Sequence, residues 1–171
     1  MVELSDYVHD VADFPQPGVV FKDLSPLFGD GRAFAAAIDL IVGAHERGSI
    51  DKVVGVEARG FLLAGPVAYL LGAGVVPVRK PGKLPREVHE RSYDLEYGSN
   101  VLQVHTDACA PGDRVLVVDD VLATGGTAAA AVHLVEHSGA TVAGLAVLLE
   151  LAFLSGRAAL PAVDVQALIT V

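Results

Sequence analysis

Residues 115–127, Val-Leu-Val-Val-Asp-Asp-Val-Leu-Ala-Thr-Gly-Gly-Thr, constrain the fold of this chain more than any other segment. The segment opens with an apolar run without polar alternation, which is typical of a central parallel strand covered on both faces. Two carboxylates and a glycine-rich turn follow, and residues 127–137 then have a helical pattern. This order predicts one unit of an α/β fold with a ligand at the carboxyl end of the strand.

The turn after the two carboxylates predicts a phosphate site. Its five residues are Ala123, Thr124, Gly125, Gly126 and Thr127. At a helix N-terminus, free backbone N–H groups and the helix dipole favour an anion, and glycines let the backbone approach it closely. Asp119 and Asp120 would repel a phosphate, so they suit the hydroxyl groups of a ribose. An ordinary capped helix with two solvated aspartates is the alternative, and the complete turn favours a ribose 5-phosphate site.

Strand and helix patterns alternate along most of the chain. Strands are expected at 52–56, 75–78, 114–118, 141–149 and 163–171. Helices are expected at 4–14, from Asp30 or Gly31 to Gly48, from Gly60 to Gly72, and at 127–137. Residues 91–97 and 101–106 predict an antiparallel hairpin around Gly98-Ser99-Asn100. The pattern predicts a single α/β domain, residues 1–171, with a mostly parallel sheet flanked by helices.

Composition limits the possible classes of function. The 171 residues are 52% hydrophobic and 19% charged, enough apolar material for one buried core. The net charge of −9 argues against a nucleic-acid binder. No apolar run is long enough to span a membrane and no secretion signal is apparent, so we expect a cytoplasmic protein. The single cysteine, Cys109, excludes a cysteine-based metal cluster.

Positive charge is concentrated in one stretch of this acidic chain. Five of the twelve basic residues are Arg79, Lys80, Lys83, Arg86 and Arg91. A local basic segment in an acidic protein indicates a small polyanionic ligand, and a solvated loop that happens to be basic is the alternative.

Four segments in order resemble the adenine phosphoribosyltransferases, members of the type I phosphoribosyltransferase family. Residues 115–127 resemble the family's signature for phosphoribosyl diphosphate (PRPP). Residues 13–23, Asp-Phe-Pro-Gln-Pro-Gly-Val-Val-Phe-Lys-Asp, resemble its N-terminal segment, and residues 54–61 resemble its pyrophosphate loop. Residues 78–85 and 93–98 resemble its mobile loop. The resemblance implies the type I fold, with a small N-terminal hood (1–30) and a mobile hairpin (79–106).

The resemblance implies that the chain transfers the phosphoribosyl group of PRPP to adenine, giving AMP and pyrophosphate. Arg59 would bind pyrophosphate in the same loop as Glu57 and Ala58, and the Glu57–Ala58 bond is where a strained or cis peptide is expected. Arg79, Lys80 and Lys83 would add positive charge. Glu96 would lie over the reacting centre. The alternative is that Glu96 is one of three polar residues on a solvated strand face. Arg59 could likewise be a surface arginine.

The resemblance also implies a base site at Val20, Phe21 and Lys22, with Phe21 stacked on the purine. A core phenylalanine is the alternative, and Lys22 departs from the arginine that many members carry. Mg²⁺ would arrive with the diphosphate of the substrate rather than in a protein cage. A homodimer is expected, with the Arg79 region and the helix that starts at Gly60 near its interface. Two other functions remain open: a transferase for xanthine, guanine or hypoxanthine, and a regulator that binds PRPP without turnover.

Overall fold

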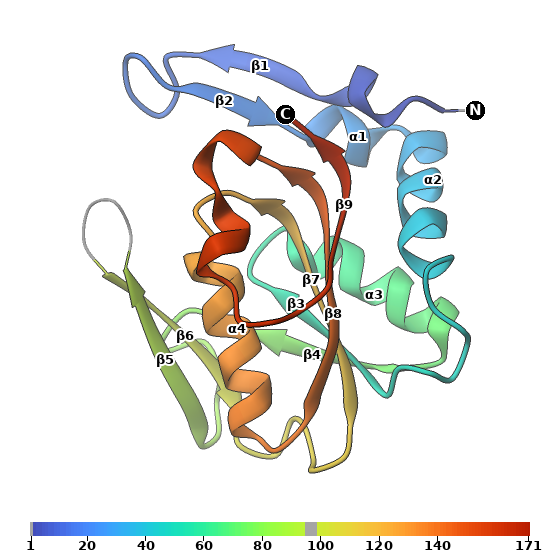
Figure 1. The fold of residues 1–171 in the computed structure, drawn as a ribbon, viewed down its shortest axis with the longest axis vertical. Helices are drawn as coiled ribbons and strands as arrows, with labels where there is room; N and C mark the ends of the chain where they lie inside the picture. Colours follow the sequence, from blue (N-terminus) through green and yellow to red (C-terminus); the bar gives the residue numbers. More distant parts are fainter. Residues whose placement is uncertain (1, 95–98) are drawn as a thin grey trace. The chain divides into compact units, whose positions relative to one another are not determined.

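The computed structural model describes residues 2–94 and 99–171 (Figure 1). These residues fall into two compact units, one up to Leu40 and one from Ile41 onward. The strands are β1 (His9–Ala12), β2 (Val20–Asp23), β3 (Lys52–Val56), β4 (Gly74–Val78), β5 (Val88–Asp94), β6 (Ser99–His105), β7 (Arg114–Leu122), β8 (Thr141–Glu150) and β9 (Val165–Thr170). The α-helices are α1 (Ser25–Gly29), α2 (Gly31–Val42), α3 (Gly60–Leu71) and α4 (Gly126–His137). The 3₁₀ helices are η1 (Leu4–Tyr7), η2 (Ala152–Leu154) and η3 (Gly156–Ala159).

The second unit is built on a five-stranded sheet in the order β4-β3-β7-β8-β9. All four pairings in this sheet are parallel. The α/β prediction with a mostly parallel sheet is therefore confirmed. The apolar runs of β7 and β8 are almost entirely buried, as expected for strands in the middle of such a sheet.

Helices cover both faces of this sheet. Val54 and Val56 of β3 belong to the same buried cluster as the inner residues of α4. Gly55, between them, faces the opposite side, where a β-carbon would lie 2.7 Å from that of Ala64 on α3. Because successive residues of a strand point to opposite faces, α4 and α3 lie on the two sides of the sheet, as Figure 1 shows.

The hairpin β5–β6 forms a separate two-stranded antiparallel sheet. Its register pairs Tyr93 with Asn100 and Asp94 with Ser99, so the connection lies between Asp94 and Ser99. The predicted turn at residues 98–100 is wrong by this register, because Ser99 and Asn100 already belong to the returning strand. The arms pack against α4, and one further bridge joins Gln103 to Arg79.

Two helix predictions need correction. The expected helix at 4–14 is the short η1 followed by β1, which pairs antiparallel with β2. The helix predicted to end at Gly48 ends at Val42. Asp30 does cap its start, accepting hydrogen bonds from the backbone N–H groups of Arg32 and Ala33 at 2.9 Å each.

Candidate active site

The acidic end of β7 lies beside the predicted phosphate turn. The strand continues past its predicted end at Val118, so Asp119 and Asp120 are part of the strand and largely buried, at 9% and 6% exposure. The chain then turns at Gly125, with φ +87°, and α4 begins at Gly126. A positive φ of this size favours glycine. Free N–H groups of the first turn of a 12-residue helix therefore follow directly after two carboxylates.

Burial makes the charged form of both aspartates unfavourable. Burial raises the pKa of Asp119 well above its ordinary value, and the neighbouring Asp120 raises it further. Burial also raises the pKa of Asp120, and Arg59 opposes this shift. A carboxylate kept out of water needs hydrogen-bond donors. Sugar hydroxyls are suitable donors, so the pair is prepared for a polyol such as ribose.

The loop after β3 supplies a cation to this pair. Because β3 and β7 are neighbours in the sheet, their carboxyl ends lie together, and Arg59 Nε lies 2.6 Å from Asp120 Oδ2. The peptide bond between Glu57 and Ala58 is cis, as the sequence analysis expected. Gly60 brings the start of α3 against β7, since a β-carbon there would lie 2.9 Å from the carbonyl oxygen of Val118.

Glu57 contacts three residues of the basic segment. Its carboxylate lies 3.2 Å from Arg79 Nε and 2.8 Å from Lys83 Nζ, and it accepts a hydrogen bond of 3.0 Å from the backbone N–H of Lys80. The hydrogen bond from Lys83 is the main cause that holds the pKa of Glu57 below its usual range. Three of the predicted pyrophosphate contacts are therefore brought to the end of β3.

Comparison with known proteins gives the family. A family model described as "Phosphoribosyl transferase domain" matches residues 28–164. An adenine phosphoribosyltransferase of Salinispora tropica is 63% identical over 164 residues, covering 96% of this chain and 87% of that protein. The chain belongs to the adenine phosphoribosyltransferases.

Solved structures of this family have the same fold. The adenine phosphoribosyltransferase of Thermoanaerobacter pseudethanolicus superposes with a TM-score of 0.94 at 45% identity, covering 98% of each chain. The enzyme of Saccharomyces cerevisiae, solved with adenine and D-2,5-dideoxy-2,5-imino-altritol 1,6-bisphosphate, has a TM-score of 0.89 at 40% identity and covers 96% of each chain. The predicted type I phosphoribosyltransferase fold is therefore confirmed, and the chain is a member of a family of pentosyltransferases.

The sequence-predicted base residues lie on β2 in the first unit. Val20 is 54% exposed, and the Phe21 ring makes an edge contact with Phe14 at 5.1 Å between centroids. Lys22 Nζ lies 2.6 Å from Asp10 Oδ1 on the paired strand β1. The base-binding role of these three residues stays a prediction. Glu96, the predicted catalytic carboxylate, lies outside the described residues.

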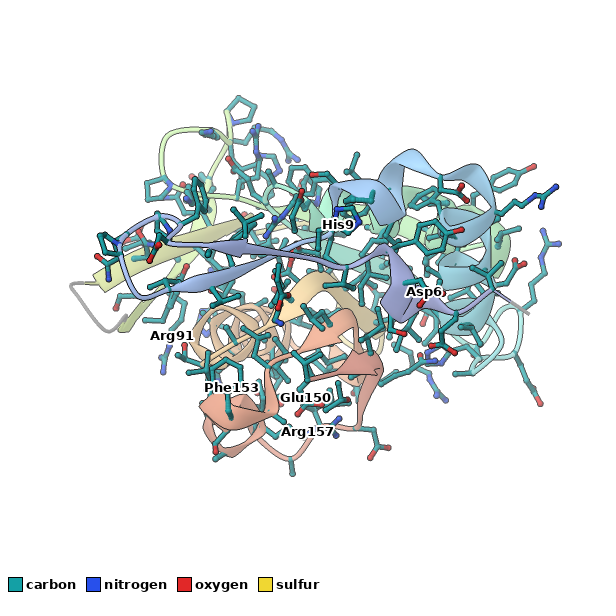
Figure 2. The ribbon with its side chains drawn as sticks, turned by 90° about the horizontal axis from the view of Figure 1, so that it is seen from above. Asp6, His9, Arg91, Glu150, Phe153 and Arg157 are labelled. Atoms are coloured by element: carbon teal, nitrogen blue, oxygen red, sulfur yellow. The ribbon has the colours of Figure 1, made fainter. Side chains whose placement is uncertain are left out.

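Sequence reasoning missed several residues that surround the phosphate turn. Gly156 lies against the turn itself. Glu150 and Arg157, labelled in Figure 2, form an ion pair at the end of β8. Gly156 belongs to none of the motifs, so its contact with the turn has no sequence signal. The ion pair gives no sequence signal, because its two members lie on different elements, β8 and η3, with η2 between them.

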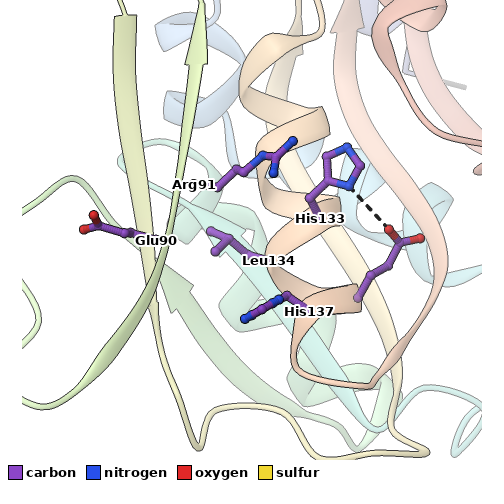
Figure 3. A pocket seen from close by; sticks show the side chains of 6 residues that line it. Glu90, Arg91, His133, Leu134 and His137 are labelled. Carbon is purple, nitrogen blue, oxygen red and sulfur yellow. Dashed lines mark ion pairs between the residues drawn. The ribbon is translucent and has the colours of Figure 1, made fainter.

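A pocket of about 440 Å³ lies between β5 and α4, away from the phosphate turn (Figure 3). Its lining has both signs of charge and comprises Glu90, Arg91, His133, Leu134, Glu136 and His137. Beside it, the rings of His89 and His137 meet edge to face at 4.6 Å between centroids. These contacts hold the arms of the hairpin on the helix that begins at the phosphate turn.

Membrane-spanning helices and metal-binding clusters are both absent from residues 2–94 and 99–171. None of the helices there has both the length and the apolar character needed to cross a membrane. In the same residues, no group of three or more His, Cys, Asp or Glu side chains is arranged to hold a metal ion.

Proposed function

We propose that this chain transfers the 5-phosphoribosyl group of PRPP to adenine, forming AMP and pyrophosphate in purine salvage. The observation that supports it most is the buried pair Asp119–Asp120, joined to Arg59 and placed directly before the phosphate turn. This arrangement suits a ligand with ribose hydroxyls between two anionic groups. The family and the yeast relative bound to adenine and an iminosugar bisphosphate support the same substrates.

The turn comprising Ala123, Thr124, Gly125, Gly126 and Thr127 binds the 5-phosphate through backbone N–H groups and hydroxyls. Asp119 and Asp120 accept hydrogen bonds from the ribose hydroxyls. In the reaction, the bond between the anomeric carbon and pyrophosphate breaks, and a bond to an adenine ring nitrogen forms. Carboxylates close to the sugar stabilise the positive charge that develops on it.

The leaving pyrophosphate is bound by the loops after β3 and β4. Arg59, Arg79 and Lys83 supply the side-chain charges, while Lys80 adds a further cation, and Glu57 and Ala58 shape the loop. Glu57 forms ion pairs with Arg79 and Lys83. Pyrophosphate competes with this carboxylate for the same cations, which ties binding of the diphosphate to release of Glu57.

Mg²⁺ accompanies the diphosphate. Buried carboxylate oxygens on Asp119 and Asp120 fit the preference of this ion for oxygen ligands. When bound, the ion neutralises charge on the diphosphate and makes it a better leaving group. It comes with PRPP, and the chain contributes Asp119 or Asp120 next to it.

Adenine binds at β2, with Phe21 stacked on the purine and the backbone of Val20 and Lys22 reading its edge. Glu96 is the carboxylate that we expect to act at the anomeric carbon and the base nitrogen, where it would stabilise the cation or move a proton. Glu96→Gln therefore lowers kcat strongly and leaves the affinity for PRPP nearly unchanged. An unchanged kcat removes Glu96 from the mechanism.

The protein acts as a cytoplasmic homodimer. The outer face of α3 carries Leu62 and Tyr69, and the edge strand β4 carries Val75, with exposures of 52%, 81% and 52%. Large apolar side chains exposed on two elements that contact each other support an interface here. Tyr69→Glu therefore shifts the molar mass measured by light scattering from that of a dimer toward that of a monomer. A wild-type protein that is monomeric at assay concentration overturns this part.

The reaction is tested by pyrophosphate release from PRPP and Mg²⁺ with adenine, hypoxanthine, guanine and xanthine in parallel. Release with adenine alone is expected. Release with a 6-oxopurine would keep the mechanism and change the base. If the protein binds PRPP but releases no pyrophosphate with any of the four bases, it is a non-catalytic regulator.

A further inference from the structure

Glu150 and Arg157, labelled in Figure 2, form a bidentate ion pair at the carboxyl end of β8. Arg157 Nε and one terminal nitrogen donate to the two carboxylate oxygens of Glu150, each at 2.7 Å. The other terminal nitrogen donates to the carbonyl oxygen of Val165 at 3.2 Å. Glu150 is buried and is the last residue of β8, while Arg157 belongs to η3. The guanidinium therefore fixes η3 to the ends of two strands.

The fixed helix η3 lies directly against the phosphate turn. A β-carbon on Gly125 would lie 2.1 Å from the carbonyl oxygen of Gly156, and one on Gly156 would lie 2.2 Å from that of Ala123. Ala159 is also close, with its β-carbon 3.0 Å from the same point above Gly125. The two backbones touch without any side chain between them, so a shift of η3 must move the turn.

A second link joins the same two segments. The backbone N–H of Leu151 donates to the carbonyl oxygen of Leu122 at 2.9 Å, at the point where β7 passes into the turn. Between these links, Ser155 has φ +52°, an unfavourable conformation for a residue with a side chain. Such a conformation persists only where surrounding contacts impose it, and Arg157 is two residues away.

We infer that Glu150 and Arg157 are positioning residues for the 5-phosphate of PRPP, acting through η3 on the turn at Ala123–Gly125. A turn that binds an anion through backbone N–H groups works best when those groups are already aligned, because ordering them on binding weakens affinity. The pair supplies this alignment from outside the site. The inference rests on the proposed role of residues 123–127 in binding phosphate.

The test uses the full chain with Glu150→Gln, Arg157→Gln, Arg157→Lys and the double variant Glu150→Gln/Arg157→Gln. The KM for PRPP is expected to rise about tenfold in each glutamine variant, with the KM for adenine within about twofold of wild type. The double variant is expected to be no worse than the worse single variant, since both changes break one contact. The KM for PRPP of Arg157→Lys should lie between those of wild type and Arg157→Gln, because lysine keeps the charge but cannot make the bidentate contact.

Asp107→Asn is the matched control, because it breaks an ion pair with Arg86 in which both side chains are exposed. It should leave the KM for PRPP unchanged. An unaltered KM for PRPP in the Glu150 and Arg157 variants, or additive effects in the double variant, would overturn the inference. A lower Tm with unchanged KM would show that the pair only stabilises the fold.

Two measurements separate this inference from the proposed function. Amide hydrogen exchange of residues 122–127 in the ligand-free protein should quicken in Arg157→Gln and not in Asp107→Asn, whether or not the variant turns over. Because the Arg157 side chain is 50% exposed, added guanidinium should restore the KM for PRPP in Arg157→Ala but not in Glu150→Gln. Unchanged exchange in Arg157→Gln overturns the inference even if wild-type protein makes AMP.

Discussion

Arg59 Nε lies 2.6 Å from Asp120 Oδ2, so the loop proposed to bind pyrophosphate and the carboxylates proposed to bind ribose are joined by an ion pair across the ends of β3 and β7. Each partner is suited to one half of PRPP: the guanidinium to the diphosphate, the carboxylate to the sugar. The pair thus couples the charge state of one subsite to the other.

Replacing Arg59 by Gln should change both the rate and its pH dependence. Burial raises the pKa of Asp120 and Arg59 lowers it, so losing Arg59 raises that pKa further. The carboxylate is then protonated at higher pH, and the acidic limb of kcat/KM for PRPP should move to higher pH. At neutral pH, loss of one charge at the leaving group should lower kcat about 100-fold. An acidic limb at the wild-type position would contradict the coupling; Arg59→Lys is the control that keeps the charge.

Asp119→Asn should make the protein more stable and less able to bind PRPP. The pKa of Asp119 is raised by burial and by Asp120, so this carboxyl favours the fold below its unfolded pKa of about 3.9. That contribution is lost as pH rises through the folded-state pKa, and at neutral pH the buried charge destabilises the fold. Asparagine removes the charge and keeps an acceptor for the backbone N–H of Asp120.

The measurement is the Tm of wild type and of Asp119→Asn at pH 5 and at pH 8. The Tm of the variant should exceed that of wild type by more at pH 8 than at pH 5. Each kcal/mol corresponds to about 2–4 °C in a domain of this size. The affinity for PRPP should fall, and further in Asp119→Asn/Asp120→Asn. A variant less stable than wild type at pH 8 would refute the electrostatic argument.

Gly60→Ala should damage both the fold and the site. The added methyl would lie 2.9 Å from the carbonyl oxygen of Val118 and 3.1 Å from Asp119 Oδ1, so either the start of α3 or Asp119 must move. Overpacking of this kind costs about 1–3 kcal/mol. Thermal unfolding and the KM for PRPP measure the two effects. Gly31→Ala is the control, because Gly31 lies at the start of α2 with open space around it. This variant should keep the wild-type Tm and the wild-type KM for PRPP.

Glu57→Gln should strengthen product inhibition by pyrophosphate. The glutamate carboxylate holds Arg79 and Lys83 in the ligand-free protein, and glutamine still accepts a hydrogen bond from the backbone of Lys80. Removing the negative charge leaves the two cations free for the diphosphate. The inhibition constant for pyrophosphate should fall several-fold at low salt, and the difference should shrink at high salt. A weaker inhibition at low salt would mean that Glu57 mainly holds the loop in shape.

The elements that the sequence predicted well are those whose signals are local. The run at 52–56 matches β3 residue for residue, and Gly72, with φ +75°, ends α3 where expected. The phosphate turn and the aspartate pair lie in one continuous segment, so their juxtaposition follows from chain order. Parallel pairing of β3 with β7 then places Arg59 beside Asp120 without any further information.

The errors arise where distant pairing decides the structure. Leu4, Tyr7 and Val11 have helical spacing, yet residues 9–12 are a strand because they pair with β2. The support of the turn by η3 depends on an arginine that reaches back to Glu150 across irregular chain. No periodicity marks such a contact, and only the folded backbone brings its members together.

The hairpin β5–β6 joins the rest of the fold through the bridge between Arg79 and Gln103 and through packing on α4. It does not share a ladder with the five-stranded sheet. Its length can therefore change without disturbing the register of the sheet strands. A hairpin of another length would keep the five-stranded sheet intact and yet displace Glu96, the proposed catalytic carboxylate, so the sheet and the chemistry can vary separately.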